Sequence, residues 1–132
     1  MVNLEKVNKN EDYWEYIRVL RNSEEVSHGF IQKSNITTDQ QKIYMSLHGH
    51  TYFIIKLNNE PIGFIGDVDE DIRICIHPDH QNKGFGTKAI QEFNKLYPNS
   101  LAKVKIENEQ SRRAFEKAGY KIKYILLENG NE

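Results

Sequence analysis

One stretch near the middle of the chain, residues 71–88, restricts the fold more than any other. It begins with isoleucine at every second position, Ile72, Ile74 and Ile76, with polar or small residues between them. This alternation predicts a half-buried strand. Pro78 ends the strand because proline has no amide N–H to donate to a neighbouring strand. Two glycines and a helical spacing of apolar residues follow, so the stretch predicts a strand joined to a helix by a glycine-bearing turn.

The glycines of this turn, Gly84 and Gly86, stand at the start of the predicted helix. The first N–H groups of a helix have no partner within it, and the helix dipole places about half a positive charge there. Glycine has no Cβ, so the backbone can approach a large anion closely and adopt a positive φ. Lys83 adds a mobile cation. The turn is therefore predicted to bind a pyrophosphate.

Two common phosphate-binding motifs do not fit this turn. A Walker loop ends in Gly-Lys-Ser/Thr, whereas the order here is Gly86-Thr87-Lys88. A dinucleotide fingerprint requires a third glycine, which is missing. What remains is Gln81-x-x-Gly84-x-Gly86 between a strand and a helix. This pattern resembles the acetyl-CoA pyrophosphate loop of the GNAT family of N-acetyltransferases.

A second segment strengthens the resemblance. Asn108 follows a predicted strand, a short helix with a Ser/Ala-rich start comes next, and Gly119-Tyr120 supplies the glycine and aromatic residue expected after that helix. The two segments have the order and separation that the family shows. The resemblance is specific over residues 71–120 and looser before them.

Composition excludes several classes of protein. The chain has 132 residues, of which 38% are hydrophobic and 28% charged, which fits one globular domain over residues 1–132. A mean hydropathy of -0.72 and the polar start argue against a membrane span and a signal peptide. A net charge of -1 argues against non-specific nucleic-acid binding. A single cysteine, Cys75, allows no internal disulfide and favours the cytoplasm.

The remaining periodicity predicts an α+β fold. Strands are expected at residues 2–8, 52–57, 61–68, 72–76, 102–106 and 120–127, and helices at about 10–22, 38–48, 86–97 and 111–118. The order β-α-α-β-β-β-α-β-α-β is similar to the GNAT fold, a mixed central sheet flanked by helices. Family members typically add a seventh strand, which is short or missing here. A partner chain is one way to complete that sheet edge, so a homodimer is a possible assembly.

The resemblance implies acetyl-CoA as the acetyl donor and assigns its contacts by position. Backbone groups of the central strand would bind the pantetheine arm and the acetyl carbonyl, the turn would bind the pyrophosphate, and Asn108 would bond to the pantetheine arm or simply cap its helix. The implied cofactor-binding residues are Ile74, Cys75, Ile76, Gln81, Asn82, Lys83, Gly84, Phe85, Gly86, Thr87, Asn108 and Phe115.

The acid and the base are less well defined. Many relatives have a tyrosine acid where this chain has Phe115, which cannot donate a proton. Water or another tyrosine, such as Tyr52, would take that role. An alkyl ammonium with a pKa near 10.4 is neutral only about once in a few thousand at neutral pH, so a base would help. The candidates are Asp67, Asp71, Glu107 and His77. Asp67 and His77 are the preferred pair, although a solvated acidic turn and an exposed strand end are the simpler explanations of these two residues.

The acceptor is predicted from the first helices and the segment between them. This part of the chain is similar to N-acetyltransferases that act on nucleotide-linked amino sugars. The similarity rests on the run "LRN" ending at Asn22, the aromatic Phe30 and a Thr-Thr-Asp-Gln-Gln helix start. Arg18 and Arg21 could hold a phosphate by forked hydrogen bonds. The candidate substrate residues are Arg21, Asn22, Phe30 and Tyr52.

Several alternatives stay open at this stage. The acceptor could instead be a protein or peptide amine or another small amine, and the chain could be a non-catalytic acyl-CoA-binding module or a binder of another nucleotide phosphate. A metal site is not expected, because His48 and His50 have no third ligand at a suitable spacing. Cys75 could suggest an acyl-cysteine step, but an inert, half-buried thiol is the simpler interpretation.

Overall fold

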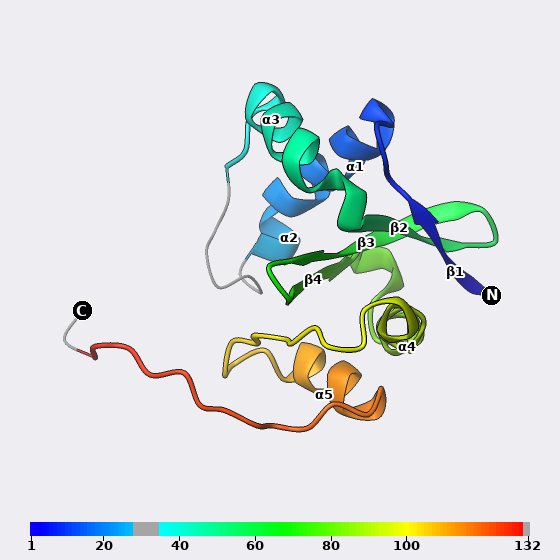
Figure 1. Ribbon diagram of the computed structural model, residues 1–132. Helices are drawn as coiled ribbons and strands as arrows, with labels where there is room; N and C mark the ends of the chain where they lie inside the picture. The colour runs from blue at the N-terminus through cyan, green and yellow to red at the C-terminus, as the bar shows by residue number, and fades with distance from the viewer. Residues whose placement is uncertain (28–34, 131–132) are drawn as a thin grey trace.

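The computed structural model describes residues 1–27 and 35–130 and has the predicted α+β organisation (Figure 1). Its elements in chain order are β1 (Val2–Lys6), α1 (Glu11–Asn22), α2 (Glu24–Ser27), α3 (Thr38–His48), the 3-10 turn η1 (Gly49–Thr51), β2 (Tyr52–Leu57), β3 (Glu60–Val68), β4 (Asp71–Ile76), the 3-10 turn η2 (Pro78–His80), α4 (Phe85–Leu96) and α5 (Glu109–Lys117).

The four strands form one antiparallel sheet in the order β1-β2-β3-β4. Two tight turns connect β2 to β3 and β3 to β4. Both central residues of each turn have positive φ, 51° and 70° at Asn58 and Asn59, and 54° and 66° at Asp69 and Glu70. Two-residue hairpins need this backbone conformation to match the twist of their strands, and Asn and Asp adopt it most readily among residues with a side chain. Consequently each strand runs next to its predecessor and β4 lies at the edge.

The sheet separates two hydrophobic clusters. In Figure 1, α1, α2 and α3 lie on one face of the sheet, and α4 and α5 lie on the other. Tyr52 and Ile54 of β2 pack into the first cluster, whereas Phe53 and Ile55 pack into the second. Successive side chains of a strand point to opposite faces, so β2 is buried on both sides. The same alternation in β4 sends Cys75 toward α1 and Ile72 toward α4.

Polar side chains cap the N-termini of α1 and α3, two of the helices that cover the first face of the sheet. The Asn10 side chain accepts a hydrogen bond from the Tyr13 amide (3.1 Å) at the start of α1. A capping box begins α3, with Thr37 accepting from the Gln40 amide (3.1 Å) and Gln40 accepting from the Thr37 amide (2.9 Å). The sequence pattern Thr38-Asp-Gln-Gln41 predicts the capping box one residue later, but Gln41 is buried and its side chain donates to the Trp14 carbonyl oxygen (2.8 Å). No helix in the described residues has the length and apolar character needed to cross a bilayer.

Two predicted strands, 102–106 and 120–127, are not formed. A single parallel bridge joins Leu101 to Asp71, after which the chain leaves β4. Residues 121–127 make no backbone hydrogen bond to the rest of the described chain. A strand needs a neighbour to accept its hydrogen bonds, and neither segment has one over its length. The prediction of these strands was therefore wrong for this chain on its own, although the class of fold was correct.

Candidate functional site

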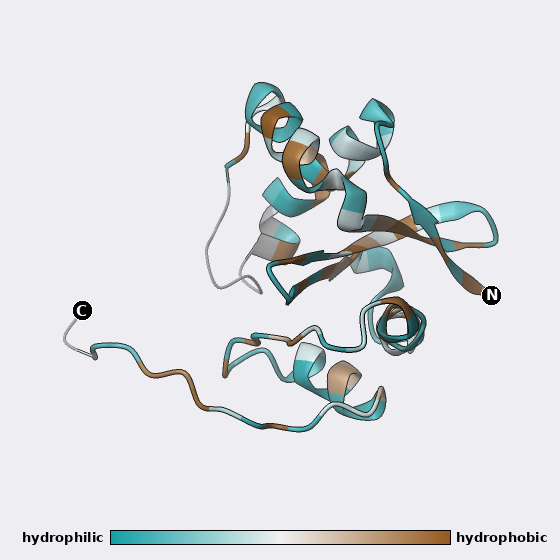
Figure 2. Cartoon of the chain, in the orientation of Figure 1, coloured by the Kyte–Doolittle hydropathy of each residue, from teal (hydrophilic) through white to brown (hydrophobic). Residues whose placement is uncertain are grey.

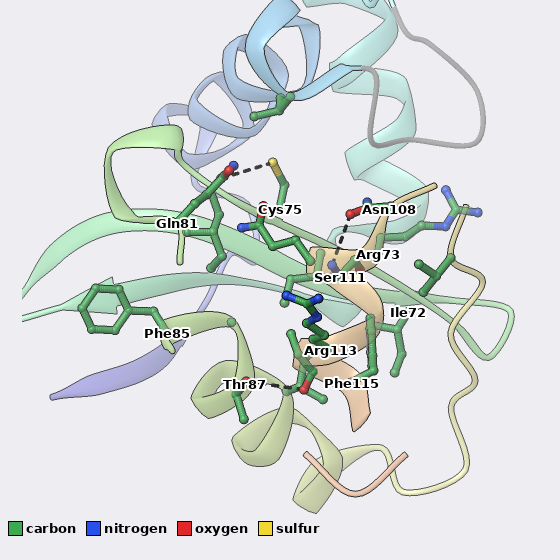
Figure 3. Close-up of a pocket in the computed structure, with 18 of the residues that line it drawn as sticks. Ile72, Arg73, Cys75, Gln81, Phe85, Thr87, Asn108, Ser111, Arg113 and Phe115 are labelled. Atoms are coloured by element: carbon green, nitrogen blue, oxygen red, sulfur yellow. Dashed lines mark hydrogen bonds between the residues drawn. The ribbon is translucent and has the colours of Figure 1, made fainter. Parts of the chain in front are cut away.

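The outer edge of β4 opens into a cavity of about 850 Å³. The cavity lies between β4, the turn that precedes α4, the helix α5 and residues 103 and 104. Figure 3 shows Arg73 and Cys75 of β4, Phe85 and Thr87 of α4, Phe115 of α5 and the residue before α5, Asn108, around this space. This volume falls within the range of small-molecule binding sites, which is about 300–1,000 Å³. We call this cavity the cleft.

The cleft exists because the chain separates from β4 after a short contact. The Ile72 amide donates to the Leu101 carbonyl oxygen (2.8 Å), and the Leu101 amide donates to the Glu70 carbonyl oxygen (2.7 Å). Beyond this point the segments diverge. Alternate residues of a strand point their amide and carbonyl groups the same way, so the N–H and C=O of Ile74 face the open edge. An extended ligand can pair with these groups as an added strand would.

The predicted phosphate turn has the backbone geometry of an anion site. Asn82 and Gly84 have φ values of 63° and 84°. The amide N–H groups of residues 82–87 donate to no other group of the described chain, and the first helical bond of α4 runs from the Lys88 amide to the Gly84 carbonyl oxygen (3.2 Å). Six successive amides therefore remain available at the positive end of a 12-residue helix.

Side chains hold this turn against its neighbours. Gln81 Nε2 donates to the Ile76 carbonyl oxygen (2.8 Å), which ties the turn to the end of β4. Thr87 Oγ1 donates to the Ala114 carbonyl oxygen (3.4 Å), which joins α4 to α5. Lys83 does not line the cleft, and its ammonium lies 3.3 Å from the Asp79 carbonyl oxygen. Gln81 and Thr87 thus have structural contacts in addition to their position in the cleft wall.

The helix α5 supplies the opposite wall. Asn108 caps it by accepting a hydrogen bond from the Ser111 amide (3.2 Å), and the same residue lines the cleft. Phe115 is buried, lines the cleft and packs edge-on against the ring of Tyr120, with 5.3 Å between ring centroids. The position of Asn108 fits both predicted roles, as a helix cap and as a contact to the pantetheine arm. Phe115 is part of the second hydrophobic cluster.

The two preferred base candidates, Asp67 and His77, lie outside the cleft lining. The Asp67 carboxylate accepts hydrogen bonds from the Ser100 hydroxyl and from the Glu70 amide (3.1 Å), so it anchors the turn between β3 and β4. His77 Nδ1 accepts from the Asp79 amide (3.1 Å) at the start of η2. His77 also lines a smaller cavity together with Tyr16 on α1. These contacts give Asp67 and His77 structural roles and bring neither to the open edge of β4.

The substrate candidates divide in a similar way. Arg21 lines the cleft. The Asn22 side chain instead donates to the Ile36 carbonyl oxygen (2.8 Å) and accepts from the Ile36 amide (2.9 Å). Tyr52 is buried and its hydroxyl lies 2.7 Å from that of Tyr44. Burial and the neighbouring Tyr44 raise the pKa of Tyr52 above its usual range, so it is protonated.

Arg18 and Phe30 are the other residues that the sequence suggested for binding the acceptor. Arg18 pairs with Glu15 (2.5 Å) and donates to the Ile36 carbonyl oxygen (3.1 Å), which occupies the guanidinium that the sequence suggested for a phosphate. Phe30 lies outside the described residues. In the described part of the chain no group of three metal-ligating side chains is found, and the His48 ring instead packs beside Tyr44.

Sequence reasoning missed several residues that line the cleft. The most informative are Arg73 of β4, Lys103 of the diverging segment and Arg113 of α5. Arg73 forms an ion pair with Asp71 (3.1 Å), and both share the face of β4 with Cys75. The period-two pattern of β4 already places Asp71, Arg73 and Cys75 on one face, so this signal was present in the sequence. Lys103 and Arg113 could be found only from the packing of their segments.

Cys75 combines a position in the cleft wall with low reactivity. Its side chain is buried, and burial raises the pKa of the thiol from 9.0 to about 12. The thiolate is the nucleophilic form of cysteine, and it is scarce at neutral pH in such a site. This environment argues against Cys75 acting as a nucleophile.

Alkaline pH is expected to destabilise the fold through Cys75. Because its pKa is about 12 in the folded chain and ordinarily 9.0, the unfolded chain loses this proton first as the pH rises above 9. The stabilisation is complete below that pH, and the free energy of unfolding should fall by roughly 2 kcal/mol between pH 8 and 10.5. Urea unfolding at both pH values would measure this change. Cys75→Ala should show a smaller loss, and an equal loss in the two proteins would contradict the assignment.

The chain is similar to a known protein family in sequence and to several solved structures in fold. The acetyltransferase (GNAT) family model matches residues 10–120. No curated protein matches the chain. Among solved structures, an aminoglycoside acetyltransferase in complex with coenzyme A and kanamycin is similar with a TM-score of 0.72 and 20% identity, over 92% of this chain and 84% of that one.

Two further structures show the same fold. The spermidine N-acetyltransferase of Vibrio cholerae, in complex with CoA and spermine, has a TM-score of 0.71 and 18% identity, over 89% of this chain and 79% of that one. A GNAT-family acetyltransferase from Bacillus anthracis has a TM-score of 0.70 and 22% identity, over 89% and 78% of the two chains. Since the family model covers most of the sequence and the fold agrees with it, the chain belongs to the GNAT family of acetyltransferases.

Proposed function

We propose that this chain transfers an acetyl group from acetyl-CoA to a primary amine of a small molecule. The observation that supports it best is the run of six available amides at residues 82–87 beside the open edge of β4. A pyrophosphate needs such amides, and a pantetheine arm needs an extended edge to pair with. Acetyl-CoA is a cytoplasmic metabolite, so we also place the protein in the cytoplasm.

In this proposal the donor follows the wall of the cleft from the turn to β4. Amides of residues 82–87 bind the diphosphate, and the open N–H and C=O of Ile74 pair with the pantetheine arm. The thioester then lies near Ile72 and Phe115, on the side of β4 that faces α4. Arg21, Arg73 and Cys75 border the cleft on the other side, where the amine would enter.

The chemistry requires little acid catalysis. The amine attacks the thioester carbonyl carbon, the C–S bond breaks, and the CoA thiolate leaves with the electron pair. A thiol with a pKa near 8.5 is a tolerable leaving group, so Phe115 in place of a tyrosine does not prevent the reaction. The amine must give up a proton before or during attack. Asp71 lines the cleft next to Ile72 and is paired with Arg73 (3.1 Å), and we propose its carboxylate as the group that receives this proton through water.

The acceptor class rests on charge around the amine side of the cleft. Arg21 and Arg73 would suit an acceptor that carries a phosphate or carboxylate in addition to its amine, such as a sugar nucleotide. The similar structures named above contain kanamycin and spermine, which are small molecules with several amines. A peptide amine is the alternative that a broad amine panel would detect.

Release of free CoA thiol tests the proposal directly. Purified protein with acetyl-CoA is incubated with nucleotide-linked amino sugars, aminoglycosides, polyamines and lysine peptides, and thiol is measured with a chromogenic disulfide. Two results together support acetyl transfer: thiol release with at least one amine, and a product heavier than that amine by about 42 Da, the mass that an acetyl group adds. Stoichiometric acetyl-CoA binding without release would indicate a non-catalytic module. Displacement of acetyl-CoA by ATP would indicate a different nucleotide ligand.

A further inference from the structure

The cleft has an apolar recess between α2 and the sheet. Val26 of α2, Phe64 of β3 and Cys75 of β4 line it, and they expose only 6%, 0% and 8% of their surface. Phe64 and Cys75 are paired across the two strands, and all three residues belong to the first hydrophobic cluster. Figure 1 shows α2 beside β4, and Figure 2 shows the hydrophobic residues of the strands in brown. On the proposed acceptor side, the cleft therefore offers a surface for an apolar group.

Charged side chains around this recess balance one another. Arg21 and Glu25 line the cleft from the helices, and Asp71 and Arg73 line it from β4. Burial raises the pKa of Tyr52 and both arginines oppose this rise, so their positive charges act on the same face of the sheet. In the described part of the chain, this side of the cleft thus has two cations and two carboxylates. Such a balance suits a ligand without net charge better than a ligand with several phosphates.

Arg73 and Asp71 can each bind one half of a zwitterion. Their ion pair joins Nε of Arg73 to Oδ2 of Asp71 (3.1 Å). Within the described residues, the two Nη groups of Arg73 donate no hydrogen bond and Oδ1 of Asp71 accepts none. A guanidinium has five N–H donors, so the Nη groups can still hold a carboxylate. An ammonium group next to that carboxylate can bind the Asp71 side chain.

We propose that the acceptor is an α-amino acid with an apolar side chain. Its carboxylate binds the Nη groups of Arg73, and its amine lies at Asp71. Its side chain packs in the recess formed by Val26, Phe64 and Cys75. The three groups diverge from one carbon atom, and Asp71, Arg73 and Cys75 occupy alternate positions on one face of a single strand. This inference rests on the acetyl transfer proposed above and narrows its acceptor.

The reaction follows from this placement. The ammonium gives one proton to Asp71 through water, and the neutral amine attacks the carbonyl carbon of the thioester near Ile72. The C–N bond forms, the C–S bond breaks, and the sulfur leaves with the electron pair as the CoA thiolate. The thiolate takes the second proton from the nitrogen, and Asp71 returns its proton to the solvent. The products are an N-acetyl amino acid and CoA.

Matched acceptors test the amino-acid assignment by release of CoA thiol. Leucine is compared with leucinamide, which lacks the carboxylate, and with serine, which lacks the apolar side chain. On reactivity alone leucinamide would be the better acceptor, because without the carboxylate its amine loses a proton more readily. We expect kcat/KM for leucine to exceed that for leucinamide about 10-fold or more, because a hydrogen-bonded ion pair is lost. Serine should be poorer than leucine by about the same factor, because it buries little apolar surface.

The variant Arg73→Gln tests which group binds the carboxylate. It should lower kcat/KM about 10- to 100-fold for leucine and much less for leucinamide. An indirect effect through Asp71 would act on both acceptors and cancel in their ratio. The matched control is Arg112→Gln, which removes the same charge from α5 outside the cleft, where Arg112 pairs with Glu109 and Glu116, and it should leave the ratio unchanged. Thermal unfolding checks that both variants fold.

The outcomes separate this inference from the proposed reaction. Equal use of leucine and leucinamide by the unmodified protein would overturn the amino-acid assignment even if Arg73→Gln failed to fold. Equal use of leucine and serine, or a ratio that Arg73→Gln leaves unchanged in a folded protein, would also overturn it. Thiol release with polyamines, aminoglycosides or amino sugars but not with leucine, methionine or phenylalanine would overturn it and leave the acetyl transfer in place. Absence of release with every amine would overturn the acetyl transfer and this inference with it.

Discussion

Replacing Gly84 with aspartate is expected to weaken acetyl-CoA binding at least 100-fold, or about 2.7 kcal/mol. Gly84 has a φ of 84°, and a Cβ built there has no neighbour within 4 Å, so the added side chain has room. Its carboxylate would lie beside the amides that are proposed to bind the diphosphate. It would repel the ligand charge and would itself satisfy the helix N-terminus.

Gly84→Asn is the matched control for this prediction. Asparagine has nearly the same shape as aspartate, and both adopt positive φ more readily than other residues with a side chain. The asparagine variant should therefore have similar backbone strain but lose far less affinity. Calorimetric titration with acetyl-CoA measures the difference, and thermal unfolding checks that both variants fold. Equal affinities for the two variants would remove the phosphate-binding role from this turn.

Gly63→Ala is expected to reduce the free energy of unfolding by about 3 kcal/mol or more. A Cβ at Gly63 would lie 2.2 Å from the Cys75 carbonyl oxygen and 3.0 Å from the Ile76 Cα. Both atoms belong to the backbone of β4, which cannot rotate away as a side chain could. The strands β3 and β4 would have to separate at the end of β4, where Gln81 attaches the phosphate turn.

The same substitution at Gly86 should have the opposite sign or none. A Cβ there meets only Ile76 Cγ1 at 3.7 Å and Ala114 Cβ at 3.8 Å, which are ordinary contacts. Gly86 lies in the first turn of α4, where alanine is favoured over glycine by up to about 1 kcal/mol. Urea unfolding of the two variants measures both effects. A Gly63→Ala protein as stable as Gly86→Ala would show that β4 tolerates displacement.

The sequence identified one wall of the cleft because that part of the site is local in the chain. The strand β4, the turn and the start of α4 are consecutive in the chain, and glycine, proline and period-two alternation act over a few residues. The residues Ile74, Cys75 and Ile76, and Gln81 to Thr87 apart from Lys83, accordingly line the cleft. Family resemblance added Asn108, which caps α5, and Phe115, which lies on α5, and both also line the cleft.

Roles that depend on long-range contacts could not be predicted in this way. Asp67 has the residue type of a base, but the Ser100 hydroxyl, far along the chain, occupies its carboxylate. Tyr52 has the residue type of an acid, yet its strand buries it against Tyr44. In both cases a distant partner decides whether a polar group faces ligand or protein, and a buried polar group must find such a partner.

The strands expected at 102–106 and 120–127 illustrate the same distinction. By itself the sequence determined that each segment has one apolar face, since alternation is a property of consecutive residues. Only the tertiary structure decided which edges are paired, because a strand is completed by hydrogen bonds to another segment. The divergence at Leu101 leaves β4 open, and that opening produces the cleft.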